Sequence, residues 1–177
     1  MNYILIMTEG TDELAFLNNL LDRGLLKFNK NELLMEQIFH SRKISGELIG
    51  YIQVLPTNDT VTIYRVGDKL SDKLTIPKAI IKEKILETYD VCTLPEFEIL
   101  YILNDGLYDD YLKNKSIKRA DVYYKEKNNN YSKRSSFVYE YFKLMSDEEI
   151  IELIKLYVQK RGGTHKKTQL SLSDIMK

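Results

Sequence analysis

The sequence predicts an α/β protein with a mostly parallel sheet that is flanked by helices. Short apolar runs rich in β-branched residues alternate, in the first half of the chain, with segments whose apolar residues recur at helical spacing. The order is strand, helix, strand, helix, strand, and parallel strands need crossover connections that are usually helical. A length of 177 residues suits one domain, or one domain with a small extension.

The first predicted strand and helix have the clearest signals. Residues 3–7 form a continuous apolar run, which is typical of a strand covered on both faces. Leucines at helical spacing follow, with Thr11 as the expected N-cap and Gly24 where a C-cap is expected. Asp12 and Glu13 fall in the first turn, where acidic side chains favour the helix dipole. We therefore expect these two acids to start the helix rather than to bind a ligand.

The next elements complete the alternating pattern. We expect a short helical turn and then a strand near residues 36–41. Residues 45–55 predict a helix with Ser45 as its cap. The β-branched residues 61–66 predict a strong strand that runs into a Gly-Asp pair.

Three further elements are expected before the chain changes character. The apolar spacing after Pro77 predicts a helix that continues to Leu86, because proline is well placed in a first turn. Residues 89–92 predict another strand. A helix is then expected to open at Pro95 and to run to about residue 103.

The last third of the chain has a different composition. Lysines, arginines and an asparagine run make residues 113–135 a predicted exposed, loop-rich section, and residues 137–143 and 147–158 predict two helices. A basic tail follows, and a short apolar segment ends the chain. We therefore predict an α/β domain over residues 1–112 and a basic, mainly helical C-terminal extension over residues 113–177.

The composition excludes several classes of protein. The chain has 44% hydrophobic and 29% charged residues, as in ordinary globular proteins, and its apolar runs are too short to span a membrane. The first residues lack the basic cluster of a secretory signal. Cys92 is the single cysteine and is interpreted as a buried, inert thiol. These features predict a cytoplasmic protein without a membrane partner.

The zero net charge conceals an asymmetry. Residues 1–112 carry 18 acidic and 11 basic side chains, whereas residues 113–177 carry 8 acidic and 15 basic ones. The two halves either attract each other, or the acids hold a divalent cation while the basic half grips a phosphate backbone. Tyrosines among the bases either stack on nucleic-acid bases or fill the core, and the tail over residues 160–167 is the best local candidate for a phosphate contact.

Carboxylates follow two of the predicted strands. Glu9 stands at the end of the first strand, and Asp68 and Asp72 come after the third. The carboxyl ends of neighbouring parallel strands share one edge of a sheet, so these side chains are expected to converge. Mg²⁺ prefers oxygen ligands and is often held by one or two carboxylates with water and substrate phosphates. A magnesium site formed by Glu9, Asp68 and Asp72 is the resulting hypothesis.

The same residues resemble the Toprim domain of topoisomerases, primases and the OLD and RloB groups of nuclease-like proteins. The resemblance covers roughly residues 1–105 and rests on strand–Glu9-Gly10–helix followed by strand–Gly67-Asp68. It implies acid/base or metal-binding work for Glu9 and matches Asp68 to the first aspartate of a magnesium-binding Asp-x-Asp pair. The next acid here is Asp72, so the spacing is Asp-x-x-x-Asp. Glu98 matches the glutamate of the Pro-x-Phe-Glu segment in RloB-like proteins.

Two functions are compatible with these features. The first is a magnesium-dependent nuclease or nuclease-related protein acting on DNA or RNA, with Glu9 as general acid/base or ligand and Asp68 and Asp72 as ligands. The resemblance also implies a role in phage defence or mobile elements. The second is a catalytically degenerate module that binds nucleic acid, a protein partner or a second copy of itself. The altered aspartate spacing and the small size of the chain favour the second function.

Overall fold

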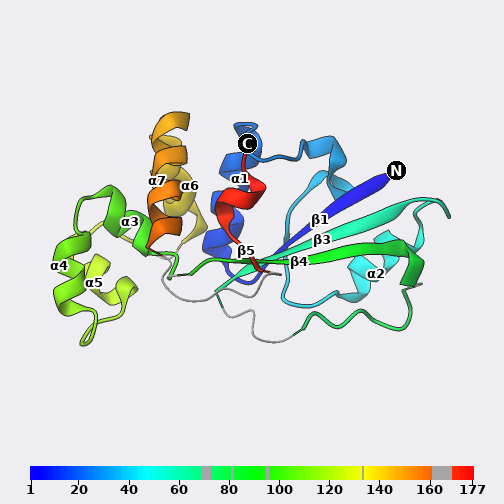
Figure 1. The fold of residues 1–177 in the computed structure, drawn as a ribbon, viewed down its shortest axis with the longest axis horizontal. Coiled ribbons are helices and arrows are strands. Elements are labelled where there is room, and N and C mark those ends of the chain that lie inside the picture. Colours follow the sequence, from blue (N-terminus) through cyan, green and yellow to red (C-terminus); the bar gives the residue numbers. More distant parts are fainter. Residues whose placement is uncertain (69–72, 81, 95, 133, 161–168) are drawn as a thin grey trace.

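The computed structural model describes residues 1–68, 73–80, 82–94, 96–132, 134–160 and 169–177. Its centre is one five-stranded sheet in the order β2-β1-β3-β4-β5, in which every pair of neighbouring strands is parallel (Figure 1). The strands are β1 (Asn2–Thr8), β2 (Phe39–His40), β3 (Thr60–Gly67), β4 (Ile85–Cys92) and β5 (Gln169–Leu170). The predicted α/β fold with a mostly parallel sheet is therefore confirmed.

Helices cover both faces of this sheet. Within the described residues they are α1 (Thr11–Asp22), α2 (Gly46–Gln53), α3 (Ile99–Asn104), α4 (Tyr108–Asn114), α5 (Ala120–Lys127), α6 (Ser135–Lys143) and α7 (Asp147–Gln159). Leu5 and Ile63 pack with Leu48 of α2 on one face. Ile4 and Ile6, which alternate with Leu5 along β1, belong to the larger cluster that contains α1 and the C-terminal helices. The continuous apolar run of β1 thus serves two cores.

Helix α1 begins one residue away from the predicted position. Gly10 occupies the N-cap without a side-chain hydrogen bond, and Thr11 is the first helical residue, so the predicted Thr11 cap is wrong. The predicted end is confirmed, because Gly24 has a φ of +69° just after the helix. A residue without a Cβ adopts this left-handed conformation at little cost.

The helix predicted to start at Pro77 is wrong. The chain forms only a 3₁₀ turn at Lys82–Lys84 before β4 starts at Ile85, which lies opposite Val61 of β3. Sheet pairing along the whole of β3 outweighs the local helical spacing of the isoleucines. The helix expected at Pro95 is shorter, since α3 starts at Ile99, and Pro95 itself lies outside the described residues.

The section predicted to be an exposed loop, residues 113–135, is partly wrong. It contains α5, and Tyr123, Tyr124 and Tyr131 are buried there. Tyr124 and Tyr131 belong to a cluster of aromatic rings around Tyr101, which is fully buried. These three tyrosines therefore fill the core, which is one of the two roles that the sequence left open for the tyrosines of the basic half. The helices predicted over 137–143 and 147–158 are confirmed as α6 and α7.

The C-terminal end of the chain returns to the sheet. Leu170 of β5 lies opposite Val91 of β4, and Lys177 donates a backbone hydrogen bond to Leu25 just after α1. The larger core cluster contains residues from both sides of position 112. The division of the chain into a domain over residues 1–112 and an extension over residues 113–177 remains a prediction. Cys92 is buried, as expected. The tail over residues 161–168 lies outside the described residues.

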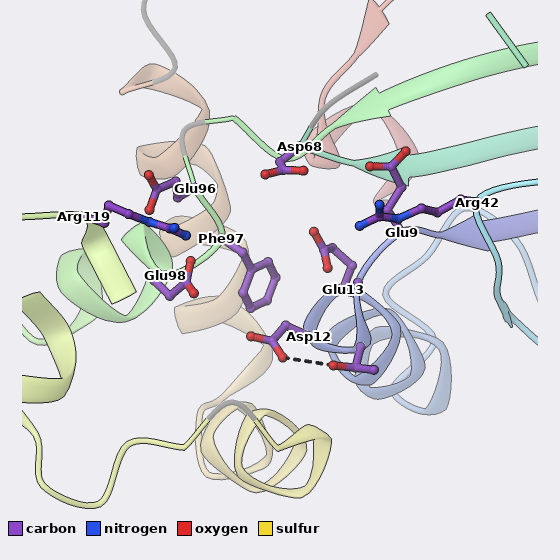
Figure 2. Close-up of a pocket in the computed structure, with 11 residues that line it drawn as sticks. Glu9, Asp12, Glu13, Arg42, Asp68, Glu96, Phe97, Glu98 and Arg119 are labelled. Atoms are coloured by element: carbon purple, nitrogen blue, oxygen red, sulfur yellow. Dashed lines mark hydrogen bonds between the residues drawn. The ribbon is translucent and has the colours of Figure 1, made fainter. Parts of the chain in front are cut away.

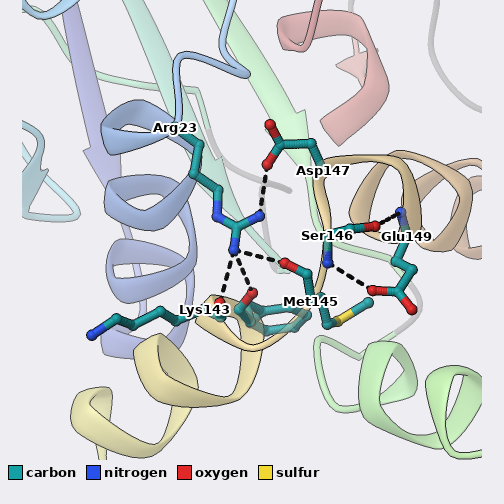
Figure 3. A network of polar contacts seen from close by, with 7 residues as sticks. Arg23, Lys143, Met145, Ser146, Asp147 and Glu149 are labelled. Carbon is teal, nitrogen blue, oxygen red and sulfur yellow. Dashed lines mark hydrogen bonds and ion pairs between the residues drawn. The ribbon is translucent and has the colours of Figure 1, made fainter.

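Arg23 fastens the end of α1 to the turn between α6 and α7 (Figure 3). Its guanidinium donates to the carbonyl oxygens of Lys143 and Met145 at 2.9 and 2.7 Å, and it pairs with Asp147 at 2.7 Å. Next to it, Ser146 caps α7 by accepting from the backbone N–H of Glu149. The carbonyls at the end of one helix and the acid at the start of the next are both satisfied by one side chain.

Candidate functional site

A cavity of about 520 Å³ lies where β1 and β3 end, between α1 and the segment that leads into α3 (Figure 2). Its charged lining consists of six carboxylates and two arginines. These residues are Glu9, Asp12, Glu13, Asp68, Glu96, Glu98, Arg42 and Arg119. The carboxyl edge of a parallel sheet is where α/β proteins place their ligand sites. We call this space the acidic cavity.

Glu9 is positioned by the pairing of β1 with β3. Its backbone N–H donates to the carbonyl of Val66 at 2.9 Å, and its own carbonyl lies 3.2 Å from Nε2 of His40. The Glu9 side chain lies over Gly67, where an added Cβ would come within 2.6 Å of Glu9 Cγ. Gly67 thus leaves the space that the Glu9 side chain occupies.

The structure brings two of the three predicted site residues together. Glu9 and Asp68 both line the acidic cavity, as expected from the shared edge of β1 and β3. Asp72 lies outside the described residues. Glu98, singled out by the resemblance, lines the same cavity.

Glu13 also lines the acidic cavity, although the sequence predicted only that it helps to start the first helix. It is only 8% exposed, accepts a hydrogen bond from Thr93 Oγ1 at 3.2 Å, and lies so close to Gly10 that an added Cβ there would be 2.1 Å from Oε2. Burial raises the pKa of Glu13, and the charges of Asp12 and Asp68 raise it further. The signal was available, because helical side chains tilt toward the N-terminus and so toward the strand end.

The opposite wall holds carboxylates that already have structural partners. Glu96 accepts from the backbone N–H of Ala120, the first residue of α5, at 3.2 Å. Glu98 accepts from the hydroxyl of Tyr131 at 3.3 Å. Arg119, which pairs with Asp121 at 3.4 Å, completes this wall (Figure 2). The wall therefore joins the sheet edge to the C-terminal helices.

The donor chemistry of the acidic cavity suits a hard divalent cation. Six carboxylates face two arginines, so the cavity lining carries excess negative charge that a cation would offset. Carboxylate oxygens are the ligands that Mg²⁺ prefers, usually one or two with water in the other positions. Within the described residues, no three histidine, cysteine or acidic side chains are placed to hold one ion together. A magnesium ion here would keep several waters or take substrate oxygens as ligands.

Comparison with family models, with curated proteins and with solved structures found no match to this chain. In the part of the chain that the structure describes, no helix has the length and apolar character to cross a bilayer. The function must therefore be inferred from the chemistry of the cavity itself.

Proposed function

We propose that this protein is a magnesium-dependent, Toprim-like nuclease that hydrolyses phosphodiester bonds of DNA or RNA in the acidic cavity. The observation that carries the proposal is that Glu9 and Asp68, which follow the adjacent parallel strands β1 and β3, meet Glu13 of α1 in one cavity. Gly10 and Gly67 leave room for two of these carboxylates. The resemblance of the Glu9-Gly10 and Gly67-Asp68 segments to the Toprim motifs supports the same conclusion.

The cavity residues have separable roles in this reaction. Glu9 and Asp68 supply carboxylate oxygens for the ion, and a bound Mg²⁺ would polarise the phosphodiester and lower the pKa of an attacking water. Glu13 keeps its proton to a higher pH than an exposed glutamate, because burial disfavours its charged form. That property suits a group that hands a proton to the leaving oxygen. Arg42 and Arg119 line the cavity and offset part of the repulsion between its carboxylates and a polyanion.

A second candidate function is a degenerate Toprim-like module that binds nucleic acid or a protein partner without cleaving it. The placement of the described acids favours it, since no three of them are arranged to hold one ion. The Asp-x-x-x-Asp spacing from Asp68 to Asp72 favours it as well. In this case the cavity would retain a cation or a basic partner group but lack the geometry for hydrolysis. A role in phage defence or mobile elements rests on the resemblance alone, and we propose it for the nuclease and for the degenerate module alike.

A cleavage assay tests the proposal. Labelled single-stranded and double-stranded DNA and RNA are incubated with the native protein in Mg²⁺ or EDTA, and in Mg²⁺ with the variants Glu9→Gln and Asp68→Asn. We expect cleavage that EDTA abolishes and that each variant slows by at least about a hundredfold, since even residues behind the metal ligands are worth about ten- to a hundredfold. Glu152→Gln, on the exposed surface of α7, is the matched control and should cleave normally.

The outcomes separate the two candidates. Cleavage that is undiminished in Glu9→Gln and Asp68→Asn would refute the assignment of the active site. Binding of nucleic acid without any cleavage, weakened by Asp68→Asn, would leave the degenerate module as the function. The substrate that is cleaved decides between DNA and RNA.

A further inference from the structure

A second cavity adjoins the acidic one and has the opposite charge. It encloses about 350 Å³ and is lined from three places, namely the segment after β2, the end of β3 and the segment before Pro77. Arg42 lines both cavities. The second cavity opens on the α2 face of the sheet, because Ile44 in its wall and Ile63 on the same face of β3 both pack in the α2 core. We call it the basic cavity.

The charged lining of the basic cavity is entirely cationic. Arg42, Lys43, Arg65 and Lys73 line it, together with the hydroxyl-bearing Thr75, and none of its described lining residues is acidic. Only Arg65 pairs with a carboxylate nearby, that of Asp90 at 3.0 Å. No ion pair joins the other three to a carboxylate of the described residues. Lys43 and Lys73 thus line the basic cavity without an ion pair to a described carboxylate, whereas Arg42 also borders the carboxylates of the acidic cavity.

Arg65 is the least expected of these residues. Its side chain is 1% exposed, and it lies near the end of a strand whose neighbouring positions on the same face are Val61 and Ile63. Burying a cation costs several kcal/mol, and an apolar side chain of similar volume often stabilises a core at least as well. The ion pair with Asp90 at 3.0 Å offsets part of this cost, and Arg65 lies in the wall of the basic cavity. A guanidinium in a cavity wall is well suited to a phosphate group, because its planar fork matches two phosphate oxygens.

We infer that the basic cavity binds a phosphate group of the nucleic-acid strand, next to the phosphodiester that lies in the acidic cavity. This inference rests on the proposed function for the identity of the ligand. It assigns the two cavities different tasks: the acidic one holds the cation and the reacting group, and the basic one fixes the register of the strand. Arg42, which lines both, stands between the two phosphate positions.

Binding of a short labelled oligonucleotide in EDTA tests this inference without any need for cleavage. Lys43→Gln and Lys73→Gln are the test variants, because both side chains are exposed and their loss should leave the fold intact. We expect each variant to bind about tenfold more weakly at low salt and to reduce the salt slope of the affinity by about one. Lys78→Gln is the matched control, since Lys78 is exposed on the same segment but does not line the cavity.

Binding measurements with inorganic phosphate and with Mg²⁺ distinguish failure of the phosphate-site inference from failure of the nuclease proposal. Competition of inorganic phosphate with the oligonucleotide in the native protein supports the inference, whereas binding of inorganic phosphate without any binding of the oligonucleotide overturns it. Equal affinities for the native protein, Lys43→Gln and Lys73→Gln overturn it as well. If the variants lose oligonucleotide binding while the native protein binds no Mg²⁺ and cleaves nothing, the phosphate site stands and the nuclease proposal falls.

Discussion

At the scale of single residues, the acidic cavity is built from contacts that sequence patterns only partly reveal. Glu9 and Asp68 were predictable, because strand ends are visible in the sequence and their edge is a known place for ligand sites. Glu13 was assigned to the helix start. The tilt of helical side chains toward the N-terminus indicates that it lies near the strand end, but no short-range pattern shows its contact with Thr93, 80 residues away. The basic cavity was missed for the same reason, as Arg42, Arg65 and Lys73 meet only in the folded chain.

The variant Glu13→Gln should make the protein more stable at neutral pH. The folded-state pKa of Glu13 is raised above its usual 4.5, mainly by burial, so the charged form is disfavoured in the folded protein. The contribution of the protonated carboxyl to stability is complete below about pH 4.5 and is lost as the pH rises through the folded-state pKa. Urea unfolding from pH 4 to pH 8 should show equal stabilities at the acidic end and a growing advantage for Glu13→Gln above it. An advantage that shrinks as the pH rises would contradict the raised pKa.

Gly67→Ala should damage the site while leaving the fold intact. The new Cβ would come within 2.6 Å of Glu9 Cγ, so the Glu9 side chain must leave its position. We expect at least about a tenfold loss of magnesium affinity, in line with the effect of disturbing residues around metal ligands. Gly50→Ala is the paired control, because nothing lies within 4 Å of its added Cβ and the residue is inside α2. That variant should gain about 0.5–1 kcal/mol of stability and bind the metal normally. Normal metal binding by Gly67→Ala would show that the position of Glu9 is irrelevant.

At the scale of elements, the sequence predicts the helices and strands that are stabilised mainly by local interactions, such as capping and regular apolar spacing. Strand β3 and helices α1, α2, α6 and α7 have strong periodicity or capping residues and were predicted correctly, apart from the N-cap of α1. The segment after Pro77 has isoleucines at helical spacing, yet Ile85 enters the sheet because β3 offers a full length of strand to pair with. Residues 113–135 are rich in lysine and asparagine, which predicts exposure. Their tyrosines nevertheless pack in the same core as the residues of α3, and no local sequence pattern predicts this long-range contact.

Arg23→Ala should loosen the junction of α1 with α6 and α7. The guanidinium serves three carbonyl groups and Asp147, and hydrogen bonds to a charged group contribute about 1.5–3 kcal/mol each at best. We expect a loss of about 2–3 kcal/mol in the free energy of unfolding, measured with urea, because the side chain is only partly buried. Arg23→Lys should recover part of this loss, since a lysine keeps the charge but lacks the fork. A change no larger than that of Lys155→Ala, an exposed control on α7, would rule out this role for Arg23.

At the scale of the whole molecule, the two halves of opposite charge share one core. Phe16 of α1 and Phe142 of α6 pack in the same aromatic cluster, with ring centroids 4.6 Å apart. Strand β5 adds the last part of the chain to the sheet formed by the first part. The acidic cavity is bounded by both, since Glu9 follows β1 and Arg119 precedes α5. The charge asymmetry visible in the sequence thus corresponds to parts that meet at the candidate site.

The shared core predicts a single cooperative unfolding transition. Residues from both sides of position 112 belong to one hydrophobic cluster, so neither part can unfold without exposing the apolar surface of the other. Tyrosine fluorescence, to which tyrosines on both sides of position 112 contribute, and far-ultraviolet circular dichroism should give coincident urea transitions. Two separated transitions would show that residues 113–177 fold as a unit of their own.

Magnesium binding by titration calorimetry tests the central claim most directly, because it reports on the acidic cavity whether or not the protein cleaves anything. The native protein should bind Mg²⁺ at millimolar concentrations or below, and Glu9→Gln and Asp68→Asn should each lose at least about tenfold in affinity. Glu152→Gln should bind as the native protein does. Absence of binding at millimolar Mg²⁺, even with an oligonucleotide present, or equal binding by all four proteins, would contradict a magnesium site formed by Glu9 and Asp68.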